Sequence, residues 1–198
     1  MGRVRRTGIL TLAAALAIGA CSTGDKDLAL REHPGGIPDL TGEQTRRAQT
    51  MLMIINEYRI QKGLPGLVLE RHLMRAAQWQ SEDQAQTAGL SHDSTTGRKL
   101  GDRVSAVGYE YRMTGETLSR GSSDVQKTFE GWLSSPPHYK VLTHEKYVHA
   151  GIGFSWSTQR GVKEPVWAVV VGRPLQRMWD RTMVIGFEEA RPGKDKQL

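Results

Sequence analysis

The sequence predicts one α+β domain, because helical patterns come first and strand patterns come last. The chain has 198 residues, enough for one ordinary domain with a sizeable core. In the first half, apolar residues recur at three- and four-residue spacing, as amphipathic helices require. Later, residues 149–156 and 165–171 are β-rich and flank a polar, glycine-containing loop, which predicts a hairpin.

Four helical segments are expected before the hairpin. The first, residues 41–63, opens with a capping-box pattern and ends at a glycine. The second spans about residues 70–87 with an apolar stripe, and a short third helix spans residues 102–107. The fourth, residues 122–134, is expected to end at the proline pair 136–137, since proline removes a backbone donor and fixes φ.

The strand at residues 166–171 is apolar at every position, which predicts a central strand buried on both faces. Trp132, Trp156 and Trp167 occupy apolar-face positions and are expected in the core rather than in a ligand cage. No internal repeat or low-complexity tract interrupts the domain.

Residues 1–20 are interpreted as a signal peptide. Three arginines precede an uncharged apolar run at residues 8–20, which is too short to span a bilayer comfortably but suits a secretory h-region. The run ends in residues 18–21 (IGAC), which resembles the bacterial lipobox, so Cys21 is predicted to be lipidated. The alternative is a free, buried cysteine in an uncleaved N-terminal helix. Arg5-Arg6 leaves both Sec and twin-arginine export open.

Cys21 is the only cysteine, so an intramolecular disulfide is excluded. Residues 21–40 mix charge with glycine and proline and are expected to be a flexible tether. The domain is assigned to residues 41–185, and the charged tail 186–198 is expected to be disordered. Ser22 after the cysteine fits the periplasmic face of an outer membrane if the cell has two membranes.

Charge and motifs exclude several function classes. The net charge of +6 falls to +3 when the three leader arginines are removed. The chain also lacks a basic stripe interleaved with aromatic residues, so the sequence gives no indication of nucleic-acid binding. Neither a phosphate-binding glycine loop nor a Gly-x-Ser-x-Gly elbow is present. His144 and His149 flank a glutamate, but five-residue spacing places them about 140° apart on a helix, so they are predicted to be surface or structural histidines.

A dispersed set of polar residues remains, namely His92, Glu116 and His138. Together with their surroundings they resemble the CAP superfamily of cysteine-rich secretory, antigen-5 and pathogenesis-related proteins (the SCP domain), in its bacterial branch. The resemblance runs in order through residues 55–59 (INEYR), Leu73 with Ala77, 91–92 (SH), 101–109, 115–118 (GETL), 132–138 (WLSSPPH) and 150–153 (AGIG).

The resemblance implies a three-layer α-β-α sandwich with a central, mainly antiparallel sheet. It also implies a central cleft lined by His92, Glu116 and His138, sometimes with a divalent metal. Because Pro136-Pro137 is expected to end the preceding helix, His138 is expected to turn inward toward Glu116 rather than continue along a helix face. Two imidazoles and a carboxylate would suit zinc, with Glu116 as ligand or base. The family's asparagine after the glutamate is Thr117 here, a second glutamate is Ser135, and the usual arginine after the last histidine is Tyr139.

Three roles for this trio stay open: a hydrogen-bonded brace, a metal or ligand site, and true catalysis. We expect an exported, lipid-anchored protein of the bacterial cell envelope that acts mainly as a binding or interaction module. Its ligand would be a lipid, a small molecule or a protein, and the chain is expected to be monomeric. The alternative is a zinc-dependent hydrolase of peptides or envelope polymers, with Glu116 as the candidate catalytic residue.

Overall fold

A four-stranded mixed sheet forms the middle layer, and a computed structural model describes it within residues 42–175. The strand order is β1-β3-β4-β2, with β1 (Val68–Leu69) and β2 (Tyr111–Arg120) at the two edges. Strand β3 (His149–Ser157) runs antiparallel to β4 (Glu164–Pro174), which runs antiparallel to β2. Only the short β1–β3 pair is parallel. The expected mainly antiparallel sheet is therefore confirmed.

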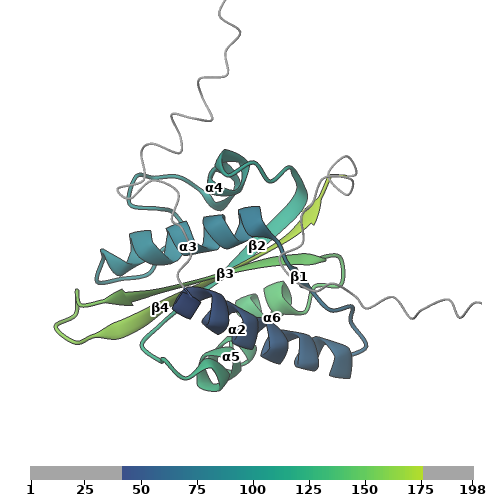
Figure 1. The fold of residues 1–198 in the computed structure, drawn as a ribbon, viewed down its shortest axis with the longest axis horizontal. Coiled ribbons are helices and arrows are strands. Elements are labelled where there is room, and N and C mark those ends of the chain that lie inside the picture. The colour runs from purple at the N-terminus through teal and green to yellow at the C-terminus, as the bar shows by residue number, and fades with distance from the viewer. Residues whose placement is uncertain (1–41, 176–198) are drawn as a thin grey trace, which may run out of the picture.

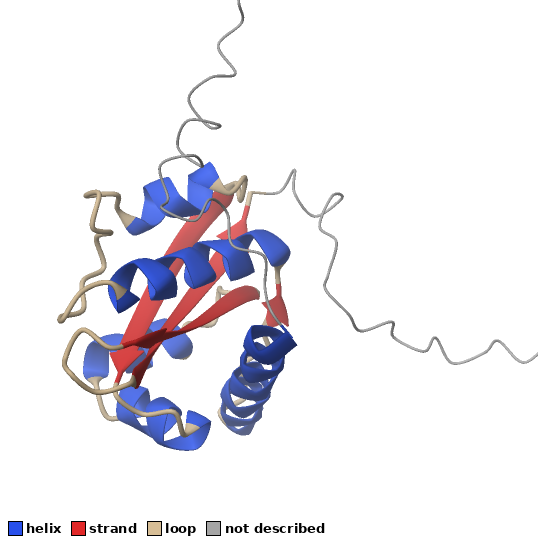
Figure 2. Ribbon diagram, turned by 60° about the vertical axis from the view of Figure 1, so that its left-hand side comes forward, coloured by secondary structure: helices blue, strands red, loops and turns tan. Residues whose placement is uncertain are grey.

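Helices cover both faces of this sheet (Figures 1 and 2). Helices α3 (Arg71–Ala85) and α4 (Leu100–Ala106) lie on one face. Helices α2 (Gly42–Gln61), α5 (Val125–Leu133) and α6 (Pro136–Leu142) lie on the other. The predicted three-layer α-β-α sandwich is therefore confirmed.

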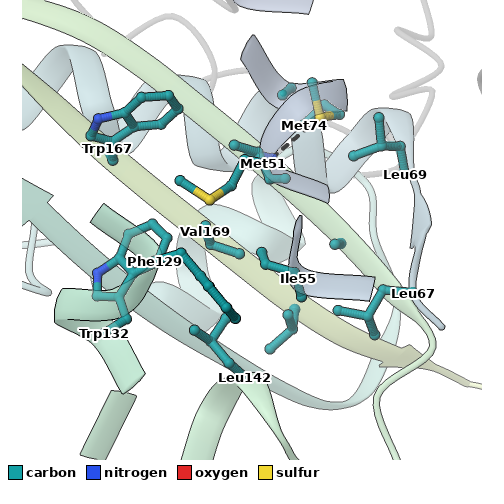
Figure 3. Close-up of a cluster of buried hydrophobic side chains, with 14 of the residues drawn as sticks. Met51, Ile55, Leu67, Leu69, Met74, Phe129, Trp132, Leu142, Trp167 and Val169 are labelled. Atoms are coloured by element: carbon teal, nitrogen blue, oxygen red, sulfur yellow. Dashed lines mark hydrogen bonds between the residues drawn. The ribbon is translucent and has the colours of Figure 1, made fainter. Parts of the chain in front are cut away.

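Strand β4 joins the two halves of the core, because its side chains alternate between them. Trp167, Val169 and Val171 belong to the cluster under α2, α5 and α6, part of which Figure 3 shows. Ala168 and Val170 belong to the cluster under α3 and α4. All five are fully buried, which confirms the predicted central strand.

Helix α3 lies directly on β3, because two strand residues on that face have no side chain. A Cβ atom on Gly151 would lie 2.0 Å from the carbonyl oxygen of Leu73, and one on Gly153 would lie 2.1 Å from that of Ala77. Both obstructions are helix backbone, which has no rotamer to change. These two glycines therefore set the distance between helix and sheet.

Side chains of α3 also complete the hydrogen bonding of β3. Strand β1 pairs with β3 only at His149 and Ala150, so the rest of that edge lacks a strand partner. The Gln78 amide accepts a hydrogen bond from the Phe154 N–H at 3.0 Å and donates one to the Phe154 carbonyl at 3.1 Å. The helix thus satisfies backbone groups that a longer β1 would otherwise pair.

Arg59 ties the end of α2 to the end of α6. The guanidinium is fully buried and donates to the carbonyls of Pro65 at 2.9 Å, Leu142 at 2.7 Å and His144 at 3.2 Å. Leu142 is the last residue of α6, whose final carbonyls lack helical partners. A cation at this helix terminus is also favoured by the helix dipole.

The proline pair begins a helix, in contrast to the expectation that it only ends one. Helix α5 ends at Leu133, and Pro136 then occupies the first position of α6. Proline suits that position because its missing N–H would have no helical partner, and its φ is already helical. His138 consequently lies within α6, not in a turn behind the prolines.

Two strands and one tryptophan depart from the sequence predictions. Strands β1 and β2 were not predicted, since β1 has only two residues and β2 carries several polar side chains. Trp156 is 39 % exposed, whereas Trp132 and Trp167 are buried as expected. The predicted leader, tether and tail (1–20, 21–40 and 186–198) lie outside the described residues, as do Thr41 and residues 176–185 of the assigned domain. Within residues 42–175, no helix is both long and apolar enough to cross a membrane.

Candidate functional site

Glu116, on the edge strand β2, is the centre of the candidate site. Its carboxylate is 1 % exposed, and both oxygens have partners. Oε1 accepts a hydrogen bond from Nδ1 of His92 at 2.9 Å, and Oε2 accepts one from Nη2 of Arg103 at 2.6 Å. The buried charge is therefore neutralised and its hydrogen-bonding capacity is used.

Arg103, on α4, links the carboxylate to the segment that carries His92. Its side chain is fully buried, and Nη1 donates to the carbonyls of His92 at 2.8 Å and Arg98 at 3.0 Å. One guanidinium thus binds both the His92 backbone and the carboxylate that holds the His92 ring. This residue was quoted within the CAP resemblance, but its pairing with Glu116 was not predicted.

Helix α3 holds the backbone on both sides of His92. Gln84 accepts a hydrogen bond from the Ser91 N–H at 2.7 Å and donates to the Asp93 carbonyl at 3.2 Å. Gln80 donates to the Ser91 carbonyl at 2.7 Å. Both glutamines are buried, so the segment is fixed from the interior of the domain.

The His92 ring itself reaches solvent, with 58 % of its side chain exposed. Its hydrogen bond to Glu116 raises the pKa of His92 above the ordinary value of 6.5, against a smaller opposing effect of burial. Because Nδ1–H donates to Glu116, Nε2 is the nitrogen left to meet a ligand.

His138 approaches the same edge of the sheet from the opposite helical layer. It lies on α6 and is partly buried, and burial followed by the charge of His92 lowers the pKa of His138. Within residues 42–175, no hydrogen bond joins His138 to Glu116. The structure therefore brings His92 and Glu116 into contact and places His138 near His92, whereas His138 was expected to turn toward Glu116.

The predicted three-ligand zinc site does not fit this geometry. The Glu116 carboxylate already binds a guanidinium and an imidazole, so no oxygen is left uncommitted for a metal. In the described part of the chain, no group of three histidine, cysteine, aspartate or glutamate side chains could hold a metal ion. The physical reason is that the positive charge of Arg103 already neutralises the Glu116 carboxylate through an ion pair at 2.6 Å.

A second carboxylate–histidine pair follows β1, at the opposite edge of the sheet, and was not predicted. Glu70 is fully buried, contacts Nδ1 of His72 at 2.6 Å, and accepts a hydrogen bond from the Leu73 N–H at 2.8 Å as the N-cap of α3.

A buried contact joins Tyr109 to His149: the Tyr109 hydroxyl and Nδ1 of His149 lie 2.9 Å apart. Burial raises the pKa of Tyr109 and lowers that of His149. The predicted structural role of His149 is consistent with this burial.

A surface hollow of about 460 Å³ lies elsewhere, against α6 and the turn that follows it. Neither His92, Glu116 nor His138 lines it. Its lining residues are Leu64, Tyr139, Lys140, Thr143, His144, Glu145 and Lys146.

The Glu116–Arg103 pair is predicted to stabilise the domain by bracing it. Glu116→Ala leaves a buried guanidinium unpaired, so we expect the free energy of unfolding to fall by about 3–5 kcal/mol in a denaturant titration. Arg103→Met combined with Glu116→Leu removes both charges. We expect this double variant to lose less free energy of unfolding than the summed losses of Arg103→Met and Glu116→Leu measured singly. Additive losses would contradict the pairing.

The pKa of His92 is predicted to lie above that of an ordinary imidazole and the pKa of His138 below it. Glu116→Gln should lower the pKa of His92 toward 6.5, and His92→Gln should raise that of His138, both followed by NMR of the ring protons. The pKa of His92 is higher in the folded than in the unfolded state. Protonated His92 therefore stabilises the fold fully below pH 6.5, and this stabilisation is lost as the pH rises through the folded-state pKa. Unchanged titration curves in both variants would refute these assignments.

Comparison with known proteins places the fold in a family. The model of the cysteine-rich secretory protein (CAP) family matches residues 52–171. A search of curated proteins found no match. Among solved structures, an extracellular protein containing an SCP domain from Bacillus anthracis is 25% identical with a TM-score of 0.58. The alignment covers 69% of this chain and 45% of that chain.

Two further bacterial structures share the fold. An outer surface protein from Borrelia burgdorferi is 19% identical with a TM-score of 0.56, over 64% of this chain and 92% of that one. A cysteine-rich secretory protein from Staphylococcus aureus is 18% identical with a TM-score of 0.52, over 68% of this chain and 41% of that one. The chain thus spans less than half the length of the Bacillus and Staphylococcus proteins. With a family model matching more than half of its residues, the chain belongs to the CAP family of cysteine-rich secretory proteins.

Proposed function

We propose that this CAP domain is an exported binding module, anchored in the bacterial cell envelope by a lipid on Cys21. The IGAC sequence at residues 18–21 supports the anchor, since no second cysteine is available for a disulfide. Export is further supported by the Bacillus relative, which is an extracellular protein. In this arrangement residues 22–41 connect the lipid to the domain.

The observation that carries the binding role is the commitment of Glu116 to Arg103 and His92. A carboxylate that already accepts a buried ion pair is a poor general base and a poor metal ligand. Its effect is to orient the His92 ring, which is 58 % exposed and close enough to His138 to lower the pKa of that residue. A lipid, small-molecule or protein ligand would therefore meet two imidazole rings held by a rigid support, with the carboxylate behind them.

The same contacts disfavour the zinc-hydrolase alternative. Zinc could bind only the two imidazoles unless Arg103 moved away from Glu116, and two neutral nitrogen ligands make a weak site. No water-activating step through Glu116 is compatible with its present partners.

Lipidation is predicted to determine where the protein is found. Cys21→Ser should move the protein from the membrane fraction to the soluble exported fraction, and intact mass should show loss of the lipid. Ser22→Ala is the matched control and should remain in the membrane fraction. A Cys21→Ser protein that still sediments with membranes would refute the anchor.

Added zinc is predicted to give no hydrolysis of casein peptides or of purified peptidoglycan. Wild type, His92→Ala and His138→Ala are compared with and without zinc, and product release is followed by mass spectrometry. Zinc-dependent turnover that both alanine variants abolish would establish the hydrolase and overturn the binding proposal.

A further inference from the structure

The β3–β4 hairpin carries an exposed surface that combines apolar and basic side chains. Trp156 is 39 % exposed and Val162 is 60 % exposed. The Nζ atom of Lys163 lies 4.8 Å from the centre of the Trp156 ring, and Cζ of Arg47, on α2, lies 5.8 Å from it. We use the term hairpin surface for Arg47, Trp156, Arg160, Val162 and Lys163.

Core packing does not account for the exposure of Trp156. Phe154 occupies the same face of β3 two residues earlier, and it is buried beneath Arg47, whose Cζ lies 4.2 Å from the ring. Helix α2 begins at Gly42, and its first turns lie against Phe154, while the Arg47 guanidinium approaches Trp156 with Cζ 5.8 Å from the ring centre. Trp156 is therefore less covered by α2 than Phe154 is. Exposing its apolar ring to water is unfavourable, and the packing of the core does not require that exposure.

The hairpin surface has an excess of positive charge. Arg47 pairs with Glu43 at 2.9 Å, and Arg160 lies 3.6 Å from the nearly buried Glu164. Glu164 is itself paired with the buried Arg120 at 3.1 Å. Arg47 also donates to the Ser123 carbonyl at 3.4 Å, and the next residue, the exposed Asp124, is the N-cap of α5. Lys163 contacts Trp156 and has no ion pair within the described residues.

The start of the domain lies at the same end as this surface. The Gln44 side chain donates to the Phe154 carbonyl at 3.4 Å, so the first turn of α2 contacts the strand just before Trp156. Figure 1 shows α2 beginning on the side from which the β3–β4 hairpin projects. Gly42, where a connection to an anchor at Cys21 would join the domain, therefore lies at the same end as the hairpin. Those 20 or so residues can span at most roughly 70 Å.

From this geometry we infer that the β3–β4 hairpin docks onto the anionic surface of a membrane. Trp156 and Val162 lie at the level of the lipid headgroups, where an amphipathic indole ring is favoured. Arg47, Arg160 and Lys163 lie over the phosphates, and Nζ of Lys163 lies 4.8 Å from the centre of the Trp156 ring. The orientation of the hairpin toward the bilayer rests on the proposed lipid anchor, whereas the chemistry of the contact does not.

Quenching of Trp156 by brominated acyl chains tests this docking. The mature protein is mixed with vesicles of brominated phosphatidylglycerol and phosphatidylethanolamine, and Trp156→Phe is measured in parallel. We expect quenching in the wild type that Trp156→Phe removes, and that weakens when phosphatidylcholine replaces phosphatidylglycerol. Equal quenching in the two proteins would overturn the proposal, since the other tryptophans would then account for it.

Charge variants test the basic part of the surface. Lys163→Glu should lower the ratio of docked to undocked protein at least fivefold, because each basic side chain near an anionic surface contributes about 1 kcal/mol. Lys62→Glu is the matched control. In the wild type, Lys62 makes a similar contact at the far end of α2, with Nζ 5.4 Å from the centre of the Tyr58 ring. Its substitution should change the ratio of docked to undocked protein less than twofold. An equal effect of both substitutions would contradict docking through the hairpin.

Three measurements separate this proposal from its alternatives. The intact mass of the mature chain reports lipid on Cys21, whereas Trp156 quenching reports the hairpin, so either can fail alone. Sedimentation without vesicles detects self-association. A dimer that Trp156→Phe dissociates, without any vesicle quenching, would assign the surface to a second copy of the chain and overturn membrane docking.

Discussion

The close contact between α3 and β3 is the constraint on which both the fold and the candidate site depend. Gly151 and Gly153 admit the helix backbone to a distance at which no side chain fits, so α3 can pack directly on the strand. From that position Gln78 completes the hydrogen bonding of β3, and Gln80 and Gln84 hold the backbone beside His92. One helix therefore connects the central sheet to the candidate site.

The site follows from how a buried charge is satisfied. Glu116 is placed by β2 on the α3 and α4 side, and Arg103 reaches it from α4. The arginine removes the cost of burying the carboxylate, and the carboxylate then orients the His92 ring. A site built in this way offers imidazole rings to a partner. The acid behind them is committed to structure, which favours binding over hydrolysis.

The sequence predicted the elements whose patterns are local. Strand β4 was predicted because every side chain from Val166 to Val171 is apolar, which reflects its burial on both faces. Strand β2 was missed because Glu116 and its polar neighbours serve the site, and because pairing with β4 is a long-range property. The trio was found only through family resemblance, since its members come from a loop, a strand and a helix.

Two further features of the site depend on three-dimensional context. Nothing in the sequence near Arg103 indicates that its charge is buried against Glu116. The direction of His138 was misjudged because a proline pair can end one helix and begin the next, and only packing on the sheet decides which occurs.

Denaturant unfolding of Gly153→Ala measures the dependence on the α3–β3 contact most directly. The added methyl group would lie 2.1 Å from the Ala77 carbonyl oxygen, so we expect a loss of about 3 kcal/mol or more in the free energy of unfolding. Gly131→Ala is the matched control, because Gly131 lies within α5 with no atom within 4 Å of an added Cβ, and alanine should stabilise that helix by about 1 kcal/mol. A Gly153→Ala protein as stable as the wild type would contradict the dependence of the fold on this contact.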